Sequence, residues 1–355
     1  MTAVPVYLTI SVIAGLWVLL VVLAVLETLF HNRVLKQIPI RIHVNGTRGK
    51  TSVARLIAAG LRAGDKRVCT KTTGSFAALT TPEGLDFPIH RPAQPNIIEQ
   101  MRMLWRMRVF EPEIAVIECM ALQPAYQDLT ERLMVRSTHG VITNARADHL
   151  DVMGPTARDV ALALAGSTPF GKRLFTAERR WLDVFESAAE ARGSSVHAVT
   201  EDDVEAVDRN RLQQFKYREH AENVALALAV CEELGVDPEE ALEGMIALEP
   251  EVGATRLLDV SFFGRSLLFV NAFAANDPES TAMIWESVIE SHREGRTLMA
   301  VINCRFDRPQ RSQQLADQAA QWTPADHYIV MGTGTLHFVQ RARRNGLETH
   351  SMTIA

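Results

Sequence analysis

The sequence predicts an α/β protein with an N-terminal transmembrane helix, a central domain built on a mainly parallel sheet, and a smaller C-terminal domain. Three observations predict this fold class. The run Val6–Leu26 carries no charged side chain. After it, short apolar segments alternate with stretches of helical periodicity, the pattern of βαβ units. A glycine-rich turn, Gly46–Thr51, lies between one predicted strand and a helix, where a phosphate-binding loop belongs.

Composition and charge narrow the class of protein. Of 355 residues, 47% are hydrophobic and 22% are charged, which suits large buried cores and about two domains besides an anchor. The net charge of −5 provides no overall basic field, so we expect no nucleic-acid partner. The four cysteines are far apart and form no Cys-x-x-Cys pair, a pattern typical of buried thiols in a reducing cytosol.

We interpret residues 1–30 as a single-pass membrane anchor. At 1.5 Å per helical residue, about twenty residues cross a hydrocarbon core of about 30 Å, and Val6–Leu26 is long enough. A cleaved signal peptide fits less well, because no basic residue precedes the run and no small-residue cleavage site follows it. Arg33, Lys36 and Arg41 come after the run, so the positive-inside rule predicts a plasma-membrane protein with a cytoplasmic body.

The body is expected to divide into two α/β domains. Short apolar segments predict strands at Ile38–Val44, Ile114–Ile117, Gly140–Ile142, Leu267–Val270, Leu298–Ile302 and Tyr328–Met331. A predicted helix, Pro238–Leu248, ends where a new strand–helix series begins. We therefore expect a central domain over residues 31–248 and a C-terminal domain over residues 249–355.

The strongest functional signal is the segment HVNGTRGKTS, which starts at His43. Its glycines let backbone N–H groups turn towards phosphate oxygens, and the following helix N-terminus adds partial positive charge. Lys50 is expected to reach the β- and γ-phosphates of a nucleotide, and the Thr51 hydroxyl to bind Mg²⁺. The standard spacing would need glycine at Val44, whereas the shorter form G-T-x-G-K-[ST] is matched in full. The predicted nucleotide-binding residues of this segment are Asn45, Gly46, Thr47, Arg48, Gly49, Lys50, Thr51 and Ser52.

Polar residues follow two predicted strands at their carboxyl ends, where parallel sheets form ligand crevices. Glu118 ends one strand, and a carboxylate there suits a hard ion such as Mg²⁺, although this residue alone predicts a surface ion pair equally well. The segment NARADHLD follows the next strand. Within it, His149 is a candidate ligand of a second divalent ion, with Asp148 or Asp151 orienting its ring. The predicted metal ligands are therefore Thr51, Glu118 and His149.

A further segment, Met101–Phe110, mixes arginines with large apolar residues. Two interpretations are open. The segment forms an amphipathic helix packed on the sheet, or it docks on the inner leaflet or on a membrane partner. A packed helix is the more usual outcome for such a pattern, and we favour it here.

Together these motifs resemble the central domain of the Mur ligase and folylpolyglutamate synthetase superfamily. G-T-x-G-K-T, the strand-end Glu118 and N-x-x-x-D-H-x-D occur in the family's order and approximate spacing. Other segments resemble the family's nucleotide contacts, and the residues concerned are His220, Asn223, Arg256 and Asn276. The resemblance covers roughly residue 38 to the C-terminus. It implies a P-loop-type central Mur ligase domain followed by a Rossmann-like domain.

Within the superfamily, three features resemble the ligase subunits of bacterial poly-γ-glutamate synthases. The apolar run leads directly into the phosphate loop, no UDP-sugar-binding domain precedes that loop, and the strings CTKTTGS and ECMALQP are similar to those subunits. The resemblance implies an ATP-dependent amide ligase of capsule biosynthesis that uses Mg²⁺ or Mn²⁺. Glutamate and the growing poly-γ-glutamate chain are the implied substrates, and small membrane subunits of a synthase and export complex are the implied partners.

The resemblance also implies a reaction and roles in it. ATP phosphorylates a carboxylate, and the amine of glutamate attacks the resulting acyl phosphate. Lys50 and the metal neutralise charge on the transferred phosphoryl group. Asp148 or His149 assists deprotonation of the amine. Arg256 and Asn276 close on the nucleotide and exclude water.

Three departures from the family pattern are visible. Leu164 stands where many relatives carry a carbamylated lysine, Asn271 replaces the usual aspartate, and the C-terminal domain is short. Other functions stay open: a Mur- or folate-type ligase with another acceptor, a membrane-tethered P-loop ATPase, or an inactive scaffold. The sequence leaves undetermined the chirality of the glutamate, the direction of chain growth and the number of subunits.

Overall fold

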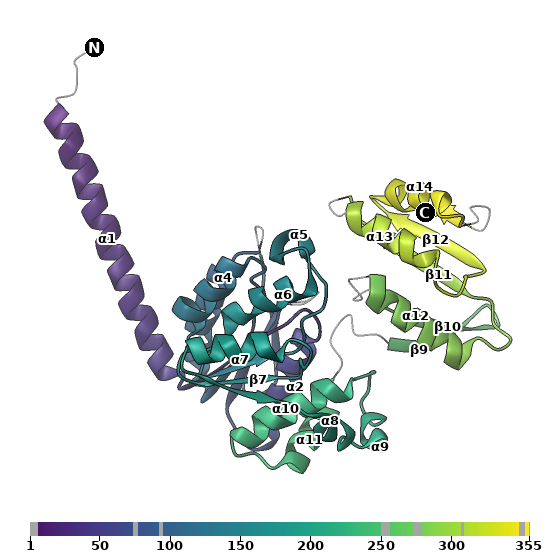
Figure 1. Ribbon diagram of the computed structural model, residues 1–355, viewed down its shortest axis with the longest axis horizontal. Coiled ribbons are helices and arrows are strands. Elements are labelled where there is room, and N and C mark those ends of the chain that lie inside the picture. Colours follow the sequence, from purple (N-terminus) through teal and green to yellow (C-terminus); the bar gives the residue numbers. More distant parts are fainter. Residues whose placement is uncertain are drawn as a thin grey trace. The chain divides into compact units, whose positions relative to one another are not determined.

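The computed structural model describes residues 6–73, 77–91, 95–249, 256–272, 278–306, 309–347 and 352–354. They form two compact units, Met1–Glu249 and Pro250–Ala355, and each has its own sheet and hydrophobic core (Figure 1). The predicted α/β class is confirmed: a long apolar helix comes first, a mainly parallel sheet follows, and a smaller parallel sheet lies in the second unit.

Within its described residues, the first unit contains eight strands in one sheet. They are β1 (Ile40–Asn45), β2 (Val68–Lys71), β3 (Ala78–Thr80), β4 (Asp86–Pro88), β5 (Ile114–Glu118), β6 (His139–Ile142), β7 (Arg173–Thr176) and β8 (Ser195–Ala198). The helices are α1 (Val6–Gln37), α2 (Lys50–Ala63), α3 (Ile98–Met107), α4 (Pro124–Leu129), α5 (Leu150–Met153), α6 (Ala157–Leu164), α7 (Leu182–Ala191), α8 (Glu201–Glu205), α9 (Arg209–Leu212), α10 (Ala221–Glu233) and α11 (Pro238–Ile246). Two short 3₁₀ helices are η1 (Arg108–Phe110) and η3 (Ala165–Ser167), and η2 (Thr130–Val135) is a π-helix.

The sheet has the strand order β4-β3-β2-β5-β1-β6-β7-β8, with β1 near its centre. All neighbours from β2 to β8 in this order pair in parallel, while β3 and β4 form an antiparallel edge. Ile42 of β1 aligns with Val116 of β5 on one side and with His139 of β6 on the other. The carboxyl ends of β1, β5 and β6 therefore meet at one edge, which is where parallel sheets bind ligands.

Both faces of this sheet are covered, so its inner strands β1, β2, β5, β6 and β7 are buried over most of their length. Ile42 and Val44 point into a core that they share with α2, α10 and α11. Alternate residues of β5 serve two cores, because successive strand side chains point to opposite faces: Val116 joins this core and Ile117 joins the one beneath α3.

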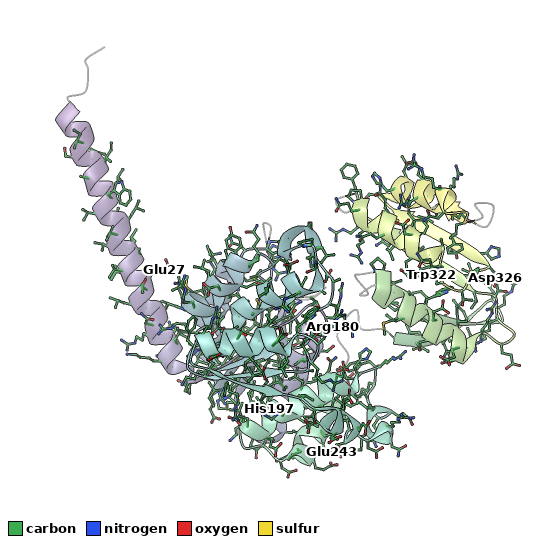
Figure 2. All side chains as sticks on the ribbon, viewed as in Figure 1. Glu27, Arg180, His197, Glu243, Trp322 and Asp326 are labelled. Carbon is green, nitrogen blue, oxygen red and sulfur yellow. The ribbon has the colours of Figure 1, made fainter. Side chains whose placement is uncertain are left out.

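Helix α1 is continuous over 32 residues and extends beyond the expected end of the anchor at residue 30. Its apolar side chains from Ile10 to Leu29 project outward without packing on the body (Figure 2). Among the described residues, this is the one helix long and apolar enough to cross a membrane, over Ile10–Gln37. Its last turns differ, since Val34 and Leu35 are buried with Ile38 against the body.

The second unit contains an antiparallel pair and a three-stranded parallel sheet. Its elements are β9 (Arg256–Phe262), β10 (Arg265–Asn271), α12 (Pro278–His292), β11 (Met299–Cys304), α13 (Pro309–Ala319), β12 (His327–Gly332), α14 (Thr335–Arg344) and β13 (Met352–Ile354). The indoles of Trp285 and Trp322 stack with ring centroids 5.5 Å apart, and Phe338 is fully buried in the same core.

Candidate active site

The loop between β1 and α2 has the backbone shape that its glycines predict. Gly46 has φ +136° and Gly49 has φ +75°, conformations that L side chains rarely adopt. There is also no room for a side chain at Gly46, because a Cβ there would lie 2.0 Å from Oγ1 of Thr143. Gly46 is therefore needed for the loop to pass close to the end of β6, and Gly49 is favoured by its positive φ.

Lys50 occupies the first position of α2 and folds back over the loop. Its Nζ donates hydrogen bonds to the carbonyl oxygens of Gly46, at 2.6 Å, and Thr47, at 3.2 Å. Burial lowers the pKa of Lys50, while the nearby carboxylates, Glu118 first among them, oppose that shift. The ammonium is thus bound to neutral carbonyl oxygens of the loop, which an incoming anionic phosphate can replace.

Glu118, the last residue of β5, is 2% exposed and binds three hydroxyl or amide groups. Its Oε2 accepts from Thr51 Oγ1 at 3.0 Å and from Thr73 N at 2.6 Å, and its Oε1 accepts from Thr73 Oγ1. Two hydroxyl oxygens and one carboxylate therefore meet at one point. This is a hard oxygen set of the kind that Mg²⁺ prefers when substrate phosphates and water complete its coordination.

The segment after β6 clasps the phosphate loop. Asn144 Oδ1 accepts from Thr47 Oγ1 at 2.6 Å and from Arg48 N at 3.1 Å, and Asn144 Nδ2 donates to Arg48 O at 3.1 Å. Asp148 forms an ion pair with Arg48, at 3.1 Å between Oδ2 and Nη2. The polar segment after β6 thus binds the phosphate loop through the hydrogen bonds of Asn144 and the ion pair of Asp148.

His149 lies beside this cluster with its side chain 48% exposed. It caps α5 in a left-handed conformation, φ +49°, and its Nε2 is 3.8 Å from Asp148 Oδ2. Over the described residues, no group of three His, Cys, Asp or Glu side chains is arranged to hold a metal. The fold thus brings two of the three predicted metal ligands, Thr51 and Glu118, together. A metal role for His149 stays a prediction.

Two of the predicted nucleotide contacts lie at the start of α10. Asn223 reaches the loop, since a Cβ on Gly49 would lie 3.0 Å from its Oδ1. Its Nδ2 donates to Glu219 Oε1 at 2.8 Å, which orients the amide. His220, the residue before α10, is exposed. Asn223 therefore borders the phosphate loop, and the nucleotide-binding role of both residues stays a prediction.

Asn45 is placed differently from its neighbours in the motif. The side chain is 2% exposed, and its Oδ1 accepts from Gly46 N at 2.8 Å. Its Nδ2 donates to Gln127 Oε1 at 2.8 Å and to Ser167 Oγ at 3.0 Å. These hydrogen bonds connect the start of the loop to α4 and η3, so the Asn45 side chain supports the loop. Ser52 lies half-buried in the first turn of α2.

In the second unit, Arg256 opens β9 and aligns with Asn271 at the end of β10. The backbone of Arg256 is described without its side chain, and Asn276 lies outside the described residues. The nucleotide contacts predicted for these two residues stay predictions. Leu164, where relatives carry a modified lysine, is fully buried among apolar side chains of α6 and α7.

Sequence reasoning missed several residues that the fold places at the site. Thr73 binds Glu118 through both its N–H and its hydroxyl. Gln100 donates from Nε2 to the backbone oxygen of Glu118 at 2.9 Å. Lys71 is fully buried and pairs with Glu99 at 3.2 Å. The string CTKTTGS was noted for its resemblance, and it contains two of these residues.

Comparisons with known proteins identify the family of the chain. The Mur ligase middle domain matches residues 44–227, and the poly-gamma-glutamate synthase CapB C-terminal domain matches residues 257–354. The chain is 36% identical over 336 residues to the capsule biosynthesis protein CapB of Bacillus anthracis, a match that covers 94% of this chain and 71% of that protein. The chain belongs to the CapB family. It is a Mur ligase-type, ATP-dependent amide ligase, as the sequence predicted.

Other relatives fit the same family. PGA synthase CapB of Bacillus subtilis is 34% identical over 330 residues, covering 90% of this chain and 83% of that protein. Among solved structures, Escherichia coli FolC in complex with ADP has a TM-score of 0.68 at 16% identity, covering 89% of this chain and 82% of that chain. A bifunctional folylpolyglutamate synthase/dihydrofolate synthase with Mn, AMPPNP and L-glutamate bound has a TM-score of 0.64 at 14% identity, covering 92% of this chain and 88% of that chain. These two likenesses show that the fold is shared.

Proposed function

We propose that this CapB-family ligase activates a carboxylate with ATP and joins glutamate through γ-amide bonds into poly-γ-glutamate. The observation that carries the proposal is the convergence of Lys50, the Thr51–Glu118 pair and Asn223 on one phosphate loop. The relatives named as capsule and poly-γ-glutamate synthases supply the substrate class.

ATP and a divalent metal, Mg²⁺ or Mn²⁺, fit this site. The hydroxyl oxygens of Thr51 and Thr73 each lie within hydrogen-bonding distance of the Glu118 carboxylate, and these three groups would hold the ion. The ion, when bound, supplies positive charge that neutralises the transferred phosphoryl group. Folylpolyglutamate synthase structures with ADP, or with Mn and a nucleotide analogue, support this assignment.

The chain's own groups would act in a defined order. The Lys50 ammonium exchanges its two loop carbonyls for phosphate oxygens, and the loop N–H groups bind the remaining charge. The half-exposed His149 is free to approach the incoming amine of glutamate and accept its proton, with Asp148 beside it. Asn223, which lies beside Gly49, would contact the nucleotide there. Arg256, His220 and Asn276 are proposed as further nucleotide contacts on the basis of the resemblance.

The proposed setting is the plasma membrane. In this proposal, α1 crosses the bilayer once and the body lies in the cytoplasm, where ATP is available. Residues 1–30 would serve as the anchor, 31–248 as the ATP-binding ligase domain and 249–355 as the Rossmann-like domain. Small membrane subunits of a synthase and export complex are proposed as partners by family resemblance.

The test is phosphate release from ATP by membranes that carry the protein and its proposed partner subunits, with and without glutamate. We expect glutamate-stimulated release and a γ-linked product. Lys50→Ala and Glu118→Gln should each reduce the rate by about 10²-fold or more, because each removes charge or metal binding at the transferred phosphoryl group. The matched control is Lys172→Ala, an exposed lysine before β7.

Two results would redirect the proposal. Robust release that is indifferent to glutamate would favour another acceptor or a membrane-tethered ATPase. Nucleotide binding without release, under every condition, would favour an inactive scaffold.

A further inference from the structure

Helix α1 is joined to the body by specific contacts just beyond its apolar run. The Trp105 indole N–H donates to His31 Nδ1 at 3.1 Å, so the other ring nitrogen carries the proton and donates to Met134 O at 2.7 Å. Phe30 packs edge-on against Trp105 with centroids 5.1 Å apart. These contacts attach α1 firmly to α3 and η2, rather than leaving a loose tether.

Arg41 reinforces this joint. Its guanidinium donates to the carbonyl oxygens of Ile38 at 2.6 Å and Arg136 at 2.7 Å, and also to that of Leu35 at 3.0 Å. A charged fork that binds several carbonyls at once holds the end of α1 against η2. Arg41 is thus committed to the body, whereas the other basic residues around the joint are exposed to solvent.

Two of those basic residues touch α1 itself. The Arg108 guanidinium lies 5.0 Å from the centroid of the Phe30 ring, and Arg136 Nη1 donates to Asn32 Oδ1 at 2.7 Å. Phe30 and Asn32 follow Leu26, the last residue of the apolar run, by four and six positions, which is about 6–9 Å along a helix. That distance places both arginines at the level of the lipid headgroups if α1 spans the bilayer.

The surrounding surface is basic and partly apolar. On α3, Met103, Leu104 and Met107 are buried, as the packed-helix interpretation predicts, which leaves the arginines of this helix exposed. The exposed cations near the joint, here called the basic collar, are Arg33, Lys36, Arg102, Arg106, Arg108 and Arg136. Exposed acidic residues next to these segments in the sequence include Glu27, marked in Figure 2, Glu111 and Glu113, which are fewer than the six cations of the collar.

We propose that the basic collar docks the body on anionic lipid headgroups of the membrane that α1 spans. The proposal rests on the membrane anchor proposed above. Arginine forks match phosphate oxygens, and cations next to a membrane span are attracted by the negative surface of the inner leaflet. Val109, 73% exposed beside Arg108, offers an apolar group that can enter the headgroup region. The two attachments together, the α1 joint and the collar, would hold the ligase body in one orientation on the membrane.

The experiment places the full chain in lipid nanodiscs and reports on the depth of Val109. The label is an environment-sensitive fluorophore on a Val109→Cys variant. Labelling is specific for this position, because the four native cysteines are all buried. Lipids carrying a quencher at the headgroup level detect contact. We expect quenching in discs with about 30% phosphatidylglycerol, and about threefold less in pure phosphatidylcholine or in about 0.5 M NaCl.

A variant with Arg102→Gln, Arg106→Gln and Arg108→Gln should also show about threefold less quenching in the anionic discs. Its matched control changes three exposed cations outside the collar, Lys172, Arg209 and Arg343, to Gln and should keep it. Equal quenching in both lipids, or quenching that survives the triple substitution, would overturn the proposal. Quenching that needs a partner subunit would assign the collar to a protein instead. Failure of the chain to stay in the discs at alkaline pH would refute the anchor itself, which is a separate readout.

Discussion

Asn144 shows how one side chain closes the phosphate loop. Its amide binds Thr47 and Arg48 at three atoms, so it needs both an acceptor and a donor. An aspartate would repel the carbonyl oxygen of Arg48, and a leucine would remove all three of these hydrogen bonds. The side chain that determines the loop's shape is thus 96 positions from Arg48 in the sequence.

A buried ion pair joins His43 of β1 to Glu131 of η2. His43 Nδ1 donates to Glu131 Oε2 at 2.8 Å, and both side chains are at most 1% exposed. Glu131 Oε1 also accepts from the N–H and the hydroxyl of Ser137. Burial by itself lowers the pKa of His43, but Cys119 and Glu131 raise it to about 10. His43 is therefore charged in the folded protein at neutral pH.

This pair predicts a pH dependence of stability. The pKa of His43 is raised from the unfolded value of about 6.5, so its contribution is complete below pH ~6.5 and disappears as pH rises towards ~10. His43→Leu should cost about 3–5 kcal/mol at pH ~6, because Glu131 loses its partner. Urea unfolding of both proteins across this range should show a difference that shrinks with rising pH. The control is His197→Leu, an exposed histidine of β8 marked in Figure 2. A constant difference would contradict the charged pair.

Among the elements, α5 and α6 form the support of the His149 segment. Thr156 begins α6 with a capping box, in which its hydroxyl accepts from Asp159 N while Asp159 accepts from Thr156 N. Gly154 ends α5 at φ +124°, and a Cβ there would lie 2.4 Å from Cβ of Asp159. The turn from α5 into α6 is therefore closed by the cap, and His149 lies one short helix away.

The cap gives a prediction at this scale. Thr156→Ala should cost about 1 kcal/mol in unfolding free energy, and it should reduce glutamate-stimulated phosphate release by about tenfold through misplacement of His149. Thr200→Ala is the matched control, because Thr200 forms the same capping box on α8. It should cost similar stability and leave activity unchanged. Equal activities of the two variants would indicate that the α5–α6 turn does not support the reaction.

The molecule as a whole contains separate cores in its two units. Phe175 is buried in the main core of the first unit, and Phe338 is fully buried in the core of the second. The members of each core come from a single unit, so each unit has the material to fold on its own.

We accordingly predict two unfolding transitions in calorimetry of the detergent-solubilised chain. Phe175→Ala and Phe338→Ala should each remove about 3–5 kcal/mol, and each should lower the midpoint of a different transition. The two substitutions control for each other, because they delete the same side chain. If both variants shifted one common transition, the units would unfold together.

The sequence predicted those parts of the molecule that depend on nearby residues. The strand–loop–helix around Gly46–Thr51 was predicted within about two residues, because glycine conformation and helical periodicity are local properties. Five further predicted strands appear as β5, β6, β10, β11 and β12. The strands β2, β3, β4, β7, β8, β9 and β13 were missed. All of them except β9 have only three or four residues and carry too little periodic signal, whereas the apolar–polar alternation over Leu258–Phe262 in β9 was an available signal. The family was also predicted, because its motifs are short and ordered along the chain.

What the sequence by itself determined is the phosphate loop, the strand-end Glu118, the long apolar helix and hence the CapB family. Only the tertiary structure decided that Thr73 and Thr51 both bind Glu118 and that Asn223 lies against Gly49. It also decided that His31 of α1 binds Trp105. These contacts join residues brought together by strand order and helix packing. A sequence pattern specifies which way a side chain faces along its own element, whereas its partner depends on which elements become neighbours in space.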